Sequence, residues 1–95
     1  RAVEQKPDYA EAQYARATTL TQLGRAREAE AAWRTALAMP LDPAYAAEGH
    51  NSLGILLGQK GDYPSARAEF ERALQLRPDL QPARQNLRMI QSMVK

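Results

Sequence analysis

The sequence predicts an all-α protein, built as an α-solenoid of two helix-turn-helix units followed by a C-terminal capping helix. Three observations support this fold class. Alanine and charged residues are abundant and glycine is scarce, which is typical of helices. One pattern of small and aromatic residues occurs twice at a constant offset. Glycine or proline stands where each paired helix is expected to end. Because 95 residues leave room for one small domain, we expect residues 1–95 to form a single one.

The repeated pattern consists of a glycine, a small residue, an aromatic residue and a second small residue. These are Gly24, Ala29, Trp33 and Ala36 in the first copy, and Gly61, Ala66, Phe70 and Ala73 in the second. Each position of the second copy lies 37 residues after its counterpart. Two antiparallel helices approach closely only where one side is small, so the alanines permit the approach and the aromatic ring fills the next layer. We expect Ala17 and Gly54 to be the small residues on the facing helices.

Turn and cap residues place the individual helices. The first helix is expected over 10–23 with Asp8 as its N-cap, and the second over 24–39, ended by Pro40. The third is expected over 44–60, with Asp42 as N-cap and Pro43 at a first helical position. Pro78 ends the fourth helix, and a fifth is expected over 82–94. The resulting divisions are a preceding helix tail at 1–7, repeat 1 at 8–43, repeat 2 at 44–80 and the capping helix at 81–95.

The two ends of the chain differ in character. Residues 1–7 resemble the end of the fourth helix, since Ala2 and Pro7 match Ala73 and Pro78, and this indicates the tail of a preceding repeat; a short N-terminal helix is the alternative. The last helix has one apolar stripe, formed by Ala83, Leu87, Ile90 and Val94. The face that a further helix would cover carries Arg84, Arg88 and Gln91. These side chains are poor core residues, so we expect this helix to cap the solenoid.

The second copy resembles the tetratricopeptide repeat family, on the residues N51-S-L-G54, G61-D-Y, A66, F70, A73-L and P78. His50 is the exception, since the family usually has Trp or another large apolar residue there. The first copy matches less well, because Arg16 and Ala17 replace a Leu-Gly pair. The family period is about 34 residues, so the link over 39–45 has extra residues, either as a longer turn or as an added turn on the next helix. The resemblance implies a right-handed solenoid.

The sequence offers little for catalysis or metal binding. There is no cysteine, and His50 is the only histidine, which we interpret as a packed or half-exposed side chain. We expect Glu28, Glu30, Glu69 and Glu71 to be solvated on the outer faces of the second helices, paired with nearby arginines. The net charge of +2 is too small to favour nucleic acid, and no apolar run is long enough to enter a membrane. We therefore expect no enzyme activity, no cofactor and no metal.

The resemblance implies a protein-interaction scaffold that binds a partner protein or peptide in a concave groove lined by the first helix of each pair. The groove residues that the resemblance implies are Tyr14, Thr18, Gln22, Asn51, Ile55, Gln59, Gln85 and Met89, with Glu11, Thr21, Glu48 and Met93 as further candidates. Most are uncharged, and amides can bind a peptide backbone without reading its side chains. The positions of the family's carboxylate clamp hold no Lys or Arg, so we expect no clamp activity. Two alternatives stay open: self-association through the N-terminal edge, and an accessory arm of a larger enzyme.

Overall fold

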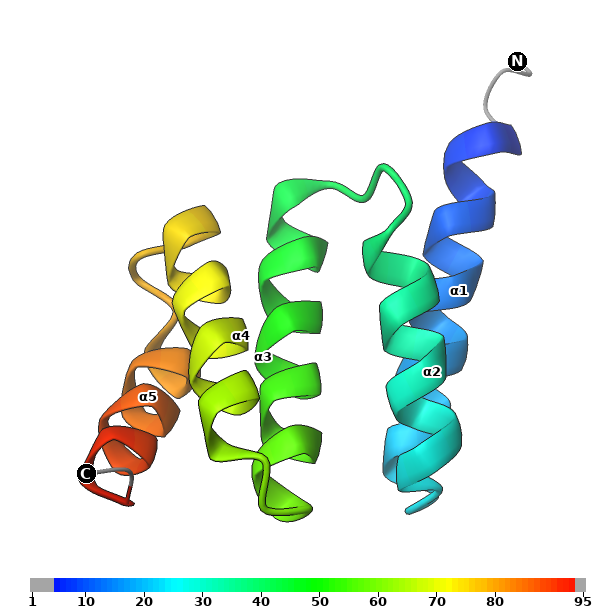
Figure 1. Cartoon of the computed structure of the whole chain (residues 1–95). Coiled ribbons are helices and arrows are strands. Elements are labelled where there is room, and N and C mark those ends of the chain that lie inside the picture. Colours follow the sequence, from blue (N-terminus) through cyan, green and yellow to red (C-terminus); the bar gives the residue numbers. More distant parts are fainter. Residues whose placement is uncertain (1–4, 94–95) are drawn as a thin grey trace. The chain divides into compact units, whose positions relative to one another are not determined.

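A computed structural model describes the backbone of residues 5–93 and the side chains of residues 9–93. This part of the chain is all-helical (Figure 1). Its helices are α1 (Gln5–Gln22), α2 (Ala26–Leu37), α3 (Pro43–Gln59), α4 (Tyr63–Leu76) and α5 (Gln81–Met93). The chain divides into two compact units, unit 1 (Arg1–Asp42) and unit 2 (Pro43–Lys95). The division falls in the link between α2 and α3, where the sequence predicts the end of repeat 1.

Unit 1 is a hairpin of α1 and α2 (Figure 1). Its buried side chains are small, apart from Leu20 and Trp33. The Trp33 indole is 2% exposed and lies edge-on to the ring of Tyr14, with ring centroids 5.3 Å apart. Its Nε1–H donates to Oγ1 of Thr21 at 3.0 Å. Because this donor has a partner, the largest side chain of the unit is buried without an unpaired polar group.

Unit 2 is a hairpin of α3 and α4, with α5 packed mainly on α4 and in part on α3. The close approach of α3 and α4 occurs at Gly54. A Cβ atom built there would lie 2.6 Å from Cε1 of the buried Phe70 ring. Phe70 therefore fills the space that the missing side chain leaves, as the sequence pattern predicts. Near the end of α4 and the start of α5, a hydrophobic cluster of buried side chains forms from Ala47, Ala73, Leu80 and Ala83. Leu74 is partly buried and packs against this cluster.

Both hairpins turn at a glycine with a positive φ, 78° at Gly24 and 90° at Gly61. In each turn the glycine N–H bonds the carbonyl three residues earlier, and the next N–H bonds the carbonyl five residues earlier. This is the Schellman arrangement, which favours glycine because other residues are strained at such a φ. The residue after each glycine has φ −89° and ψ 73°, but only Asp62 caps its helix, accepting from the Ser65 N–H at 3.4 Å.

The helix boundaries agree with the sequence-based expectation except at the start of α1. The predicted N-cap, Asp8, is wrong, since α1 already begins at Gln5. Pro7 lies in the first turn of α1, where a missing N–H costs no helical hydrogen bond. α3 begins at Pro43 as expected, and α2 and α4 end before Pro40 and Pro78. Residues 1–4 of the predicted preceding tail lie outside the described residues, and the tail and the right-handed stacking of repeats stay predictions.

The apolar stripe of α5 is only partly buried. Ala83 and Ile90 are buried, at 0% and 3% exposure, and they hold α5 against α4 and α3. Leu87 is only half-buried and lies beside Arg84 and Arg88 at the surface. Val94, the last residue of the predicted stripe, lies outside the described residues. Of the predicted stripe, Ala83 and Ile90 are therefore buried, whereas Leu87 is only partly covered.

Candidate functional site

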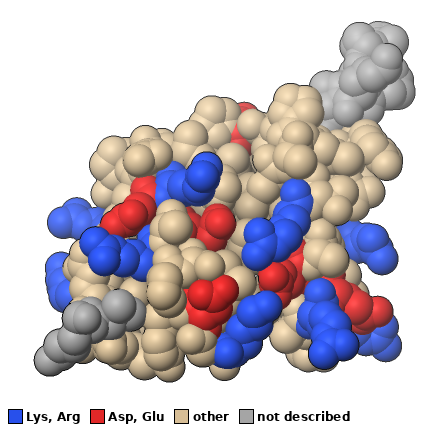
Figure 2. Space-filling view, in the orientation of Figure 1, with Lys and Arg blue, Asp and Glu red and all other residues tan. Residues whose placement is uncertain are grey.

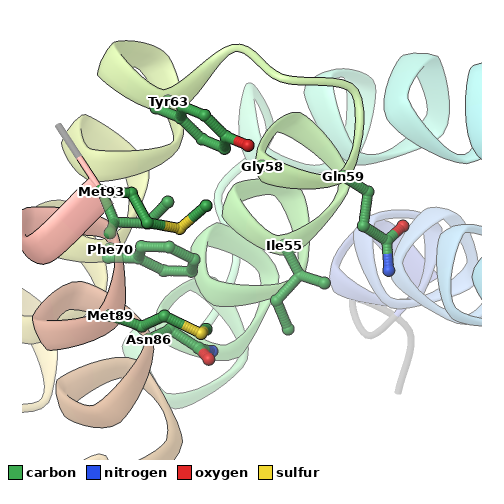
Figure 3. Close-up of a pocket in the computed structure, with 9 residues that line it drawn as sticks. Ile55, Gly58, Gln59, Tyr63, Phe70, Asn86, Met89 and Met93 are labelled. Atoms are coloured by element: carbon green, nitrogen blue, oxygen red, sulfur yellow. The ribbon is translucent and has the colours of Figure 1, made fainter.

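Unit 2 has a pocket of about 280 Å³ between α3, α4 and α5. Its walls are almost entirely apolar. They are formed by Ile55, Gly58, Gln59, Tyr63, Phe70, Asn86, Met89, Ile90 and Met93. Figure 3 shows Met89 and Met93 of α5 beside the Phe70 ring, with Ile55 on the neighbouring α3; the Gln59 amide points away from the methionines. Thioethers pack favourably on aromatic rings and adapt their shape, so this wall can fit side chains of different outline.

Three large apolar side chains on this face are exposed to solvent. Ile55 is 38% exposed, Met89 55% and Met93 50%. They contribute to one pocket, whereas a scattered exposed leucine such as Leu23 is ordinary for a small protein. A concave, mostly apolar surface with a few polar groups at its edge is the usual form of a binding site.

The two repeats differ at two positions that line the pocket. At an offset of 37 residues, Gly58 takes the place of Thr21, and Phe70 takes the place of Trp33. In unit 1 the indole of Trp33 donates to the hydroxyl of Thr21 between the helices. In unit 2 both residues are smaller, and a Cβ at Gly58 would be in ordinary contact with Ile90 at 3.7 Å and with Ala66 at 3.8 Å.

An amide pair borders the pocket. The Asn86 Nδ2 of α5 donates to the Asn51 Oδ1 of α3 at 3.1 Å, and both side chains are half-buried. This bond joins α5 to α3. It uses the NH2 group of Asn86 and the oxygen of Asn51, and it leaves the oxygen of Asn86 and the NH2 group of Asn51. The remaining amide groups can bond a ligand's backbone at the edge of the apolar wall.

The structure brings some of the predicted groove residues together in unit 2. Ile55, Gln59 and Met89 line the pocket, as does Met93, and Asn51 borders it through its bond to Asn86. Gln85 is exposed on α5 and does not line the pocket. Their role in binding a partner stays a prediction.

The predicted groove residues of unit 1 have local roles. Tyr14 packs edge-on against Trp33 and is half-buried. The hydroxyls of Thr18 and Thr21 donate to the carbonyls of Tyr14 and Ala17, so their protons are used within α1 and only lone pairs remain for a ligand. Gln22 is exposed at the end of α1.

Sequence reasoning missed five wall residues of the pocket, which are Gly58, Tyr63, Phe70, Asn86 and Ile90. Tyr63 and Phe70 come from α4, which the groove hypothesis did not include. For Gly58 and Phe70 a signal was present in the repeat itself, since they are smaller than Thr21 and Trp33 at the same positions of the first copy.

His50 lies at the interface of α3 and α4 rather than at a reactive centre. Its Nδ1 is 2.7 Å from the Glu69 Oε1, and the two side chains are only 17% and 16% exposed. The half-buried environment agrees with the sequence-based interpretation of His50. The prediction that Glu69 is solvated on an outer face is wrong, because Glu69 turns towards α3 and bonds this ring. A hydrogen bond thus stands where the family usually packs a large apolar side chain.

The other acidic residues of α2 and α4 form ion pairs along their own helices. Arg25 lies 3.5 Å from Glu28, Arg34 lies 3.0 Å from Glu30, and Arg67 lies 3.1 Å from Glu71. These are the local pairs that the sequence predicts. At such exposed positions each contributes less than about 1 kcal/mol.

Among residues 9–93, whose side chains the structure describes, no three His, Cys, Asp or Glu side chains gather in a way that could hold a metal ion. In the described backbone, residues 5–93, no helix has the length and apolar character needed to cross a membrane.

Comparison with known proteins identifies the repeat. Residues 47–80 match the tetratricopeptide repeat family, over about a third of the chain. The matched segment begins within α3, four residues after the helix starts at Pro43, and ends at Leu80, just before α5. The four residues of α3 before the matched segment are consistent with an added first turn of this helix, one of the two alternatives for the extra residues. A search of curated proteins found no match to the chain.

Proposed function

This chain carries a tetratricopeptide repeat, a protein–protein interaction module, and we propose that it binds a segment of a partner protein on the face formed by α3 and α5. Such repeats typically bind rather than catalyse. The observation that carries the proposal is the apolar pocket of unit 2, with Ile55, Met89 and Met93 exposed around it.

In this proposal, one large apolar side chain of the partner enters the pocket. It displaces water from Phe70, Ile55 and the two methionines, and burying such a side chain contributes about 1.5–3 kcal/mol. The free amide groups of Asn51, Asn86 and Gln59 bond the partner's backbone. Apolar anchors in a well-formed pocket commonly carry most of an interface's affinity, while surrounding polar contacts set its orientation. Gln85 of unit 2 is proposed as a further contact, and Tyr14, Thr18 and Gln22 stay proposed as partner-binding residues of unit 1.

The test is a comparative capture experiment with immobilised protein and lysate of the source cells. Ile55→Gln with Met89→Gln removes the apolar wall at two exposed positions. The matched control is Leu23→Gln with Leu76→Gln, which changes two other exposed leucines, at 64% and 41% exposure, that do not line the pocket. Helicity of all variants is checked by circular dichroism.

We expect a partner that the wild type and the control capture and the pocket variant does not. Mass spectrometry would identify it, and a peptide from it should then bind with the same dependence on Ile55 and Met89. If the pocket variant captured the partner as well as the wild type does, the partner would not bind on this face.

A further inference from the structure

A second surface lies on another face of α5 and is separate from the pocket. It is a shallow hollow of about 200 Å³, lined by Leu74, Arg84, Leu87, Arg88 and Gln91. Residues 84, 87, 88 and 91 of α5 follow a helical spacing and share one face. The pocket residues of α5, which are Asn86, Met89, Ile90 and Met93, occupy another face.

The charge on this surface is uncompensated. Arg84 and Arg88 are exposed, and neither forms an ion pair with any residue in the described part of the chain. This contrasts with Arg25, Arg34 and Arg67, which pair with a glutamate on their own helices. Residues 80–95 contain three basic residues and no acidic residue. Figure 2 shows basic side chains on the outer edge of the molecule where α5 lies.

The two arginines are one helical turn apart, so their charges repel each other by a few tenths of a kcal/mol in the free protein. A ligand with carboxylates at a matching spacing would relieve this repulsion. Guanidinium groups bind carboxylates through paired hydrogen bonds, which gives such contacts a defined geometry.

The floor of the hollow is apolar. Leu87 is half-buried, and so is Leu74, which packs on the cluster of Ala47, Ala73, Leu80 and Ala83. Leu74 therefore contacts the buried cluster on one side and the hollow on the other. Phosphate groups alone would leave these two leucines in water, whereas a protein segment with an apolar side chain between carboxylates would cover the leucines and neutralise the arginines together.

We propose that this face of α4 and α5 binds an acidic amphipathic helix of a partner protein. The helix places an aliphatic side chain on Leu74 and Leu87, and its flanking carboxylates bond Arg84 and Arg88. A groove between two packed helices is a usual seat for an amphipathic helix, which presents its anchors at a spacing of three and four residues. This binding is independent of the pocket lined by Ile55 and Met89.

The probe is a synthetic helical peptide of about 15 residues, with leucines on one face and glutamates beside them. A second peptide has glutamine in place of every glutamate. Affinity is measured by fluorescence anisotropy at two salt concentrations, and the contact surface is mapped from amide chemical shifts of the whole 95-residue chain.

The variant Arg84→Gln with Arg88→Gln removes both charges of the hollow. Arg16→Gln with Arg27→Gln removes two exposed charges from unit 1 and gives the same net charge. We expect the first variant to weaken binding of the acidic peptide about 5- to 30-fold and the control to change it less than about twofold. The glutamine peptide should bind the wild type as weakly as the acidic peptide binds the first variant.

Several results would overturn the proposal. Absence of binding by the acidic peptide would do so, as would equal affinity for both arginine variants or shift changes centred on Met89. Tighter binding of single-stranded DNA or of phosphatidylserine vesicles through Arg84 and Arg88 would assign the surface to another class of ligand. Because Ile55→Gln with Met89→Gln should leave this binding unchanged, failure here is distinguishable from failure of the proposed pocket function.

Discussion

Two glycines one turn apart on α3 allow a direct test of how the helices of unit 2 pack. Replacing either by alanine gains about 1 kcal/mol of helix propensity. A Cβ at Gly54 would lie 2.6 to 3.0 Å from three atoms of the Phe70 ring, which is 2% exposed. Forcing a methyl group into such a contact costs about 1–3 kcal/mol. At Gly58 the nearest atoms would be at 3.7 and 3.8 Å, an ordinary contact.

Both substitutions add one methyl group, but they should change the free energy of unfolding by different amounts or in opposite directions. We expect Gly58→Ala to stabilise the protein by up to about 1 kcal/mol. Gly54→Ala should be about 1–3 kcal/mol less stable than Gly58→Ala, because the propensity gain cancels in the comparison and the ring contact remains.

The free energies of unfolding are measured by urea denaturation followed by circular dichroism. For a chain of this size, 1 kcal/mol corresponds to about 4–8 °C in melting temperature, so the difference is easily resolved. Equal stability of the two variants would mean that Phe70 does not pack against Gly54, and the helix register deduced from the repeat would be refuted.

Other substitutions test the remaining packing and capping contacts. Ala66→Trp should unfold unit 2, because Ala66 is fully buried, and an unchanged melting curve would contradict this. Arg25→Asp should stabilise α2 by about 1 kcal/mol, since Asp62 caps α4 from the same backbone conformation; denaturation showing no gain would argue against that equivalence. Trp33→Phe should cost about 1–2 kcal/mol by removing the bond to Thr21, and a double-mutant cycle with Thr21→Val would show no coupling if that bond were absent.

Local sequence features were sufficient to predict the helices and their turns. Gly24 and Gly61 adopt the positive φ that few other residues tolerate, and Pro43 begins α3 as proline favours. The repeat at an offset of 37 residues also predicted that Phe70 fills the space between the paired helices and that Gly54 is a small residue on the facing helix, and the structure shows that these two residues lie against each other. Proline was less informative at position 7, since it is tolerated in a first helical turn as well as before a helix.

Contacts between distant residues could not be predicted in the same way. The bond from His50 to Glu69 spans 19 residues, and that from Asn51 to Asn86 spans 35, so neither appears as a local pattern. The pocket is lined by residues of α3, α4 and α5, so it depends on how α5 packs against the other two helices, and no local pattern predicts this packing. Leu87 has the spacing of a core residue but stays half-exposed because no further element covers it in the described residues.

The claim that a partner enters the pocket is tested most directly by photo-crosslinking from inside it. A benzoylphenylalanine at position 89 would react with whatever lies against that wall, and the same group at position 76, an exposed leucine outside the pocket, serves as the control. We expect a covalent adduct with the captured partner from position 89 and none from position 76. An adduct from position 76 alone would contradict the claim that the partner enters the pocket, because it would show that the partner binds elsewhere on the protein.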